Sequence, residues 1–255
     1  MFLGEIVVVD SFVVIAILSF FVGAISGAIF DQKSIELVLT AFLPALATLI
    51  AAFAGAGYAF KLQEKVREIR AKNERIASAN KAIFNLSRMY NSLVNYDDQF
   101  LKSCRNDSAS FLNVRPSIDL VKSDIQIDLD SLSFLLETSN RNILGELSSC
   151  VASYQVAIDA INDRSRIYRD QVQPRMESAG ASEANKYTLD GLKAMMGERL
   201  YCILENATSQ VFTHTENTIV EIKRVSELLT EAVKQEFPGH VIIKLATMKD
   251  MEKET

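Results

Sequence analysis

The stretch GAGYAFKLQEKVREIRAKNERI, residues 55–76, passes from an apolar run into a dense run of charges. No proline separates the two runs, and neither proline nor glycine occurs from Lys61 to Cys104. Because these are the residues that most disfavour a helix interior, a helix that enters this seam is expected to continue through it. The seam therefore predicts one helix that begins in an apolar environment and continues into water.

The apolar residues of the chain are concentrated in its first 60 positions. No charged residue occurs in residues 11–30 or in residues 37–60. About 20 helical residues, at about 1.5 Å each, cross the roughly 30 Å hydrocarbon core of a bilayer. The sequence therefore predicts a transmembrane helical hairpin with its turn at residues 31–36. A cleaved signal peptide is the alternative for the first run, but no Lys or Arg precedes that run and a second span follows at once.

The cations that flank the spans predict the orientation, because such residues remain on the cytoplasmic side. The turn of the hairpin contains only Lys33. We therefore expect a multi-pass protein of the bacterial inner membrane with both termini in the cytoplasm. The net charge of -5 disfavours general binding to polyanions, so no direct nucleic-acid partner is predicted. The cluster that sets this topology consists of Lys61, Lys65, Arg67, Arg70, Lys72 and Arg75.

The remainder of the chain, residues 61–255, is expected to be a cytoplasmic helical domain. Its first helix, residues 61–104, has an apolar residue at every seventh position, which is typical of a coiled-coil seam. This seam begins at Leu62, continues through Ile69, Ile76 and Ile83, and ends at Tyr90. The fold class is therefore all-α: a two-helix transmembrane hairpin continuing into an elongated antiparallel bundle or coiled coil.

Two further long helices are expected, at about residues 140–173 and 187–236. Asn140 is a candidate N-cap for the first of these, which should end near Pro174. Asp130 is a candidate N-cap for a short helix before it. Pro238 and Gly239 should stop the last helix, and VIIKLATM after them is either a short strand or a docking segment.

Catalytic motifs are absent from the sequence. It has no GxxxxGK[ST] phosphate loop, GxGxxG dinucleotide motif, HExxH metal helix or GxSxG nucleophile elbow. The three cysteines are widely spaced, and the two histidines have no cysteine at metal-ligand spacing. The sequence therefore predicts a protein that is not an enzyme and that uses no cofactor, metal or small-molecule substrate.

Small residues repeat at four-residue intervals along both predicted spans, a spacing that allows helix backbones to approach closely in lipid. They either close the hairpin within one chain or also make contacts between chains. In the hairpin, Gly23 should lie near Pro44 and Ser19 near Thr48. The candidate packing residues are Ser19, Gly23, Gly27, Pro44, Thr48, Ala51 and Gly55.

Two residues of the spans allow more specific predictions. Pro44 removes one backbone hydrogen bond and invites a kink in the second span. Asp10 is an N-cap at the membrane interface if the first helix begins at Ser11. If residues 6–9 are also immersed, Asp10 is instead a costly and functional intramembrane group.

Three stretches, FAGAGYAFKL, NERIASANKAIFNLSRMYNSL and SLSFLLETSNRNILGELSSCVASYQVAIDAINDRSRIYRDQVQPRM, resemble a set of uncharacterised bacterial two-span membrane proteins. The resemblance covers residues 50–176 and implies the fold and the membrane topology, without any catalytic residue. In architecture alone, a hairpin joined to a helical cytoplasmic part is similar to the transmembrane effectors of retron-type antiviral systems.

Two functions agree with these features. The first is a membrane effector of antiviral, abortive-infection defence that perturbs the inner membrane when a cytoplasmic partner releases it and its copies oligomerise. The second is a passive membrane-anchored scaffold whose heptad helix recruits another protein. In both hypotheses the partners are the lipid bilayer and either further copies of the chain or a cytoplasmic protein.

Overall fold

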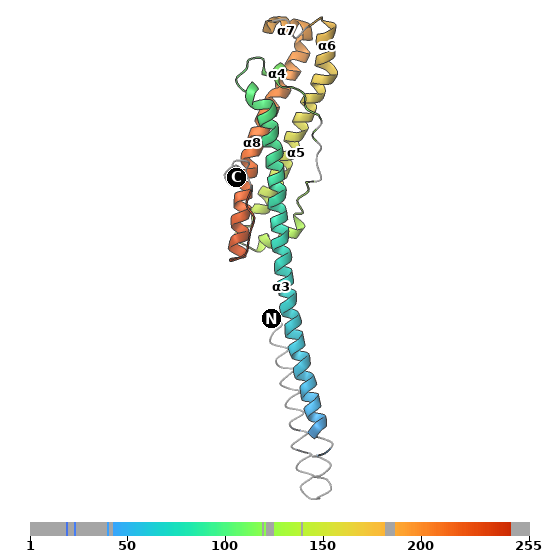
Figure 1. The fold of residues 1–255 in the computed structure, drawn as a ribbon, viewed down its shortest axis with the longest axis vertical. Helices are drawn as coiled ribbons and strands as arrows, with labels where there is room; N and C mark the ends of the chain where they lie inside the picture. The colour runs from blue at the N-terminus through green and yellow to red at the C-terminus, as the bar shows by residue number, and fades with distance from the viewer. Residues whose placement is uncertain are drawn as a thin grey trace, which may run out of the picture. The chain divides into compact units, whose positions relative to one another are not determined.

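The computed structural model describes residues 19, 23, 40, 43–118, 120, 125–138, 140–181 and 187–245. All regular elements within these residues are helical and none is a strand, which confirms the all-α fold class (Figure 1). The chain divides into two compact units, Met1–Arg70 and Ala71–Thr255. Most of the predicted first span lies outside the described residues, as do Asp10 and Gly27.

Helix α3, Leu43–Tyr96, is a single α-helix of 54 residues. It passes through the seam at residues 55–76 without interruption, which confirms the continuity predicted from the absence of helix breakers. A π-helical turn, η2 (Asp97–Leu101), and a 3-10 turn, η3 (Lys102–Cys104), follow it directly. Helical structure therefore reaches Cys104, although its last two turns are not α-helical.

The second unit contains the remaining helices. The short helices α4 (Ser110–Asn113) and η4 (Asp130–Glu137) precede α5 (Ile143–Ile167), which continues through the π-helical turn η5 (Tyr168–Val172) into α6 (Gln173–Ser178). Helices α7 (Leu189–Met196) and α8 (Glu198–Glu236) follow. Apolar side chains at spacings of three and four from α3, α5 and α8 form the main core, among them Ile83, Leu86, Leu93, Leu147, Ile158, Ile161, Val225 and Leu229.

Helix α8 runs antiparallel to α5 within this unit. Arg224 of α8 pairs with Glu146 near the start of α5, whereas Thr208 near the start of α8 lies beside Arg164 near the end of α5. Helices α3 and α5, however, run in the same direction (Figure 1). The prediction of an antiparallel bundle is therefore right for α8 and wrong for the pair α3 and α5.

The connection between α4 and η4 makes this parallel arrangement possible, because it returns along the length of the bundle. Leu120 exchanges two hydrogen bonds with the side chain of Asn162 on α5, at 2.8 and 2.9 Å. Further along, the side chain of Asn85 on α3 donates to the carbonyl oxygen of Gln126 at 2.9 Å. These side-chain amides satisfy backbone groups that have no helix or sheet partner.

Both N-caps predicted near η4 and α5 are wrong. The side chain of Asp128, not Asp130, accepts hydrogen bonds from the backbone of Asp130 and Ser131, at 3.1 and 3.3 Å. Helix α5 begins at Ile143 after Asn142, two residues beyond the predicted cap Asn140, whose side chain instead donates to Gln235 of α8. A tertiary contact on α8 therefore competes with capping.

Two predicted helix boundaries also need correction. The helix expected to end near Pro174 continues to Ser178, because Pro174 lies in the first turn of α6, where proline is tolerated. The helix expected to run unbroken from residue 187 to 236 is interrupted at Gly197, whose φ is 81°. Thr188 caps the first piece, since its side chain accepts a hydrogen bond from Gly191.

The described part of the C-terminal segment, residues 241–245, docks on the bundle and is not a strand. The backbone of Ile243 donates to the side chain of Asn80 on α3 at 3.1 Å, and Ile242 is buried. For these residues the docking alternative is confirmed and the strand alternative is wrong.

Candidate functional site

The first part of α3 is exposed although it is strongly apolar. The helical run Leu43–Cys104 contains an 18-residue window of mean hydropathy 1.6, none of which is buried. A helix that is apolar on all sides is normally covered by protein or by lipid. Among the described residues, this is the one helix long and apolar enough to cross a membrane. Its large exposed side chains are Leu43, Leu49, Ile50, Phe53, Tyr58 and Phe60.

Four predicted packing residues, Pro44, Thr48, Ala51 and Gly55, lie on this exposed part of α3. The Thr48 hydroxyl donates to the carbonyl oxygen of Pro44 at 2.8 Å, so its polar group is satisfied within the helix, as lipid requires. Residues 41 and 42 are outside the described part of the chain, so the kink at Pro44 remains a prediction.

Among the described residues, no second helix contacts the predicted packing glycines Gly23 and Gly55. Apart from the backbone of the glycine's own helical turn and its chain neighbours, no described atom lies within 4 Å of the position that a Cβ would take on Gly23 or Gly55. Ser19 and Gly23 are both helical. The proposed approach of Gly23 to Pro44, and of Ser19 to Thr48, therefore remains a prediction.

The predicted basic cluster separates into two groups. Two of its members, Lys72 and Arg75, lie in the second unit and contact aromatic rings of the bundle. Lys72 lies 5.9 Å from the ring centroid of Phe237, and Arg75 lies 5.8 Å from that of Phe134. The other four cations, Lys61, Lys65, Arg67 and Arg70, are exposed on α3 in the first unit.

The heptad positions of α3 change their environment between Ile69 and Ile76. Ile76 is only 9% exposed, Ile83 is fully buried, and Tyr90 is partly buried against the core. Before that point Leu62, Val66 and Ile69 are 52%, 51% and 51% exposed. The predicted seam is therefore covered by the bundle only in the second unit.

A buried arginine, Arg164, lies near the C-terminal end of α5. Arg164 of α5 is fully buried, and its Nη2 donates to the carbonyl oxygen of Phe111 at 2.9 Å. Its guanidinium also lies 5.1 Å from the ring centroid of Tyr168. No carboxylate of the described residues pairs with it, and its Nη1 has no hydrogen-bond partner there. Burial lowers the pKa of Arg164, because low-dielectric surroundings disfavour its charge.

Helix irregularities surround this charge. The turn η2 begins directly after Tyr96, and η5 begins at Tyr168. Burial raises the pKa of Tyr96 to about 12, an effect that the positive charge of Arg164 and the nearby Ser117 hydroxyl only partly offset. π-helical turns are often found at functional sites.

Arg164 is not among the residues predicted from the sequence, although the sequence contains a signal for its burial. Arg164 lies three residues after Ile161 and seven after Ala157, so it falls on the apolar face of α5. The groups that interact with its charge are Tyr96, Tyr168 and Cys104, and the described residues contain no cluster of His, Cys, Asp or Glu suited to a metal ion. The arrangement therefore provides a buried positive charge.

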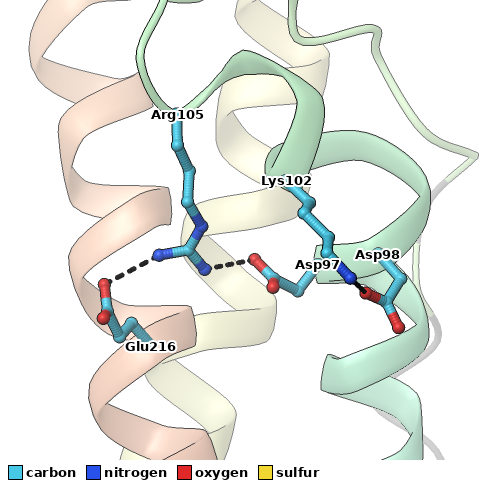
Figure 2. A network of polar contacts seen from close by, with 5 residues as sticks. All are labelled: Asp97, Asp98, Lys102, Arg105 and Glu216. Atoms are coloured by element: carbon cyan, nitrogen blue, oxygen red, sulfur yellow. Dashed lines mark hydrogen bonds and ion pairs between the residues drawn. The ribbon is translucent and has the colours of Figure 1, made fainter.

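A second polar cluster ties the end of α3 to α8 (Figure 2). Arg105 donates to Asp97 at 2.5 Å and to Glu216 of α8 at 2.9 Å. Lys102 pairs with Asp98 at 2.8 Å on the outer side of the same turn. Arg105 thus links η2 to α8 from the surface.

Comparison with protein-family models, with curated proteins and with solved structures finds no match for this chain. The resemblance to bacterial two-span membrane proteins therefore remains a prediction.

Proposed function

We propose that this chain is a membrane-anchored effector that perturbs the bacterial inner membrane when a cytoplasmic partner releases it, in the manner of the antiviral effectors that its architecture resembles. In this proposal residues 11–30 and 37–60 form a transmembrane hairpin and both termini lie in the cytoplasm. The bundle is then an elongated cytoplasmic domain that senses the partner, and the released copies associate in the membrane. The chain itself carries out no reaction.

The continuity of α3 is the observation that supports this proposal most. One helix contains both the exposed apolar window and the heptad face that is buried in the bundle. A continuous helix that belongs to two environments can pass a displacement from one to the other. A partner that moves the bundle would therefore also move the membrane helix.

Membrane potential is the readout that tests the effector. The full chain is expressed in bacteria without any neighbouring gene, and a potential-sensitive dye is followed. We expect depolarisation, and we expect the double variant Gly23→Leu with Gly27→Leu to prevent it by keeping helix backbones apart. Ile50→Leu, a change between large apolar residues at an exposed position, is the matched control and should leave depolarisation intact. Fully polarised cells at high expression would contradict the proposal.

Cysteine labelling tests the topology separately. In a chain whose exposed Cys202 is replaced by Ser, Lys65→Cys should react with a membrane-impermeant maleimide only after the cells are opened. Lys33→Cys should react in intact cells. The reverse pattern would place the bundle outside the cell and end the proposal.

The scaffold is the second candidate, and the exposure of Leu62, Val66 and Ile69 is the observation in its favour. A scaffold needs a free face for its partner but no rearrangement of its anchor. It would show full polarisation in every variant above while still holding a partner at the membrane.

A further inference from the structure

Three apolar side chains of α3, Leu62, Val66 and Ile69, form a row that we call the α3 stripe. Their spacings of four and three place them on one face of the helix, at the a and d positions of a heptad. Each is about half exposed, and the bundle covers this face only from Ile76 onward. The stripe lies in a segment that is otherwise strongly charged, so lipid does not explain its apolar character.

Cations border the stripe on both sides. At about 100° per residue, Lys65 lies on one edge of the stripe and Arg70 on the other, at the g and e positions. Glu64 and Glu68 of the same segment lie away from it. Lys65 and Arg70 are exposed, and neither forms an ion pair within the described residues. The face is thus an apolar row between two positive edges.

A second copy of α3 fits this face poorly. Two copies inserted with the same topology would be parallel, and a parallel coiled coil brings position g of one helix against position e of the next heptad of the other. Lys65 would then face Arg70 of the other copy, and like charges at this spacing destabilise the contact.

An anionic lipid surface also fits poorly. Helix α3 continues without a break from the apolar window into the stripe. If the window crosses the bilayer and ends at Phe60, Arg70 lies about 15 Å further along the helix, at about 1.5 Å per residue. The head-group layer is about 5–8 Å thick, so only Lys65 lies near it and Arg70 lies beyond it.

We propose that the α3 stripe is the docking site for an acidic amphipathic helix of a partner protein. Leucine or isoleucine residues of that helix cover Leu62, Val66 and Ile69, and its glutamates or aspartates pair with Lys65 and Arg70. This inference rests on the proposed function in one respect, since it assigns to this face the partner that restrains the effector. The docking chemistry itself does not depend on any effect on the membrane.

A peptide probe tests the docking directly. The full chain is placed in nanodiscs of zwitterionic phosphatidylcholine and titrated with a fluorescent heptad peptide that has Leu and Ile at a and d and Glu at e and g. A matched peptide has Lys at e and g. We expect the acidic peptide to bind about tenfold more tightly or better, and to weaken severalfold between about 50 mM and about 500 mM salt, because salt screens exposed charges.

Variants of the exposed stripe supply the controls. Val66→Asp should weaken the acidic peptide about tenfold, because it places a charge in the apolar row. Val220→Asp, at a 64% exposed valine of α8, should leave binding unchanged. Lys65→Glu combined with Arg70→Glu should reverse the preference toward the basic peptide.

Several results would overturn the inference. One is equal binding of both peptides, and another is binding of neither. In a Val66→Cys variant, a disulfide can join two copies of the chain. If this disulfide still forms in the presence of the acidic peptide, the face belongs to a second copy. Protection of that cysteine by phosphatidylglycerol alone would assign it to lipid. Because none of these readouts is membrane potential, docking and the effector proposal can fail independently.

Discussion

The Nη2 atom of Arg164 donates to the carbonyl oxygen of Phe111 at 2.9 Å, and the two residues are 53 positions apart in the sequence. The bond joins the apolar face of α5, near the C-terminal end of that helix, to the short helix α4. It contributes one neutral acceptor to a fully buried cation that has no carboxylate partner among the described residues. Burying an ion under these conditions costs several kcal/mol.

The effect of replacing Arg164 on the free energy of unfolding should therefore depend strongly on the volume of the new side chain. Arg164→Met removes the buried charge and keeps most of the volume, so we expect the free energy of unfolding to change by about 1 kcal/mol or less. Arg164→Ala also leaves a cavity, and we expect a loss of about 3 kcal/mol or more. Chemical denaturation of the detergent-solubilised full chain measures both. Equal losses in the two variants would mean that the guanidinium itself stabilises the bundle.

Stability should fall at alkaline pH through Tyr96. Burial raises the pKa of Tyr96 from 10.0 to about 12. The folded state therefore holds its proton more tightly than the unfolded state, so this contribution is fully present below about pH 10 and is lost as the pH rises toward about 12. Two pKa units correspond to about 2–3 kcal/mol. Tyr96→Phe should show a shallower alkaline loss in the same denaturation series, and parallel curves would refute the assignment.

The three cysteines should differ in reactivity. Burial raises the pKa of Cys150 to about 12, with the charge of Glu221 acting in the same direction, so its thiolate is scarce at neutral pH. Cys104 is buried and Cys202 is exposed. With a thiol-reactive dye under native conditions we expect one fast site, which the Cys202→Ser variant abolishes. Fast reaction of Cys150 would mean that the contact between α5 and α8 opens readily.

The same substitution should have opposite effects at two glycines. Gly197 has a φ of 81°, and Ala there should cost about 1–2 kcal/mol, because L side chains rarely adopt this conformation. Gly145 lies within α5, and no described atom outside its own helical turn lies within 4 Å of a Cβ added there. Gly145→Ala should stabilise the fold by about 0.5–1 kcal/mol. Thermal unfolding of the two variants compares them, and destabilisation in both would mean that α5 is not helical at Gly145.

The ion pairs in Figure 2 should contribute unequally. Asp97 is 18% exposed and Glu216 is 62% exposed, so Arg105 gains more from Asp97, whose charge is less screened. We expect Arg105→Ala to cost about 1 kcal/mol and a double-mutant cycle to assign most of it to Asp97. The exposed pair of Lys102 and Asp98 should show no measurable coupling. A larger coupling to Glu216 than to Asp97 would contradict the ranking.

Much of the helical architecture could be predicted from local sequence. The absence of helix breakers predicts α3 through the seam, and the apolar spacing predicts which faces of α5 and α8 are buried. Capping could not be predicted reliably, because Asn140 bonds Gln235 of α8 instead and Asp128 takes the place of Asp130 at the start of η4. The direction of α5 relative to α3 depends on the segment between α4 and η4, whose backbone is hydrogen-bonded by the side chains of Asn85 and Asn162. The apolar periodicity of a single helix contains no information about these contacts.

The sequence alone determined the continuity of α3 and the presence of an apolar segment long enough for a membrane, because helix propensity and hydropathy are properties of neighbouring residues. Only the tertiary structure decided that the heptad face is covered from Ile76 but bare at Leu62, Val66 and Ile69. It also decided that Arg164 is buried with no carboxylate partner among the described residues. Both facts depend on which helices, distant in sequence, pack against α3 and α5 at these residues. The spacing of apolar residues along one helix does not specify its packing partners.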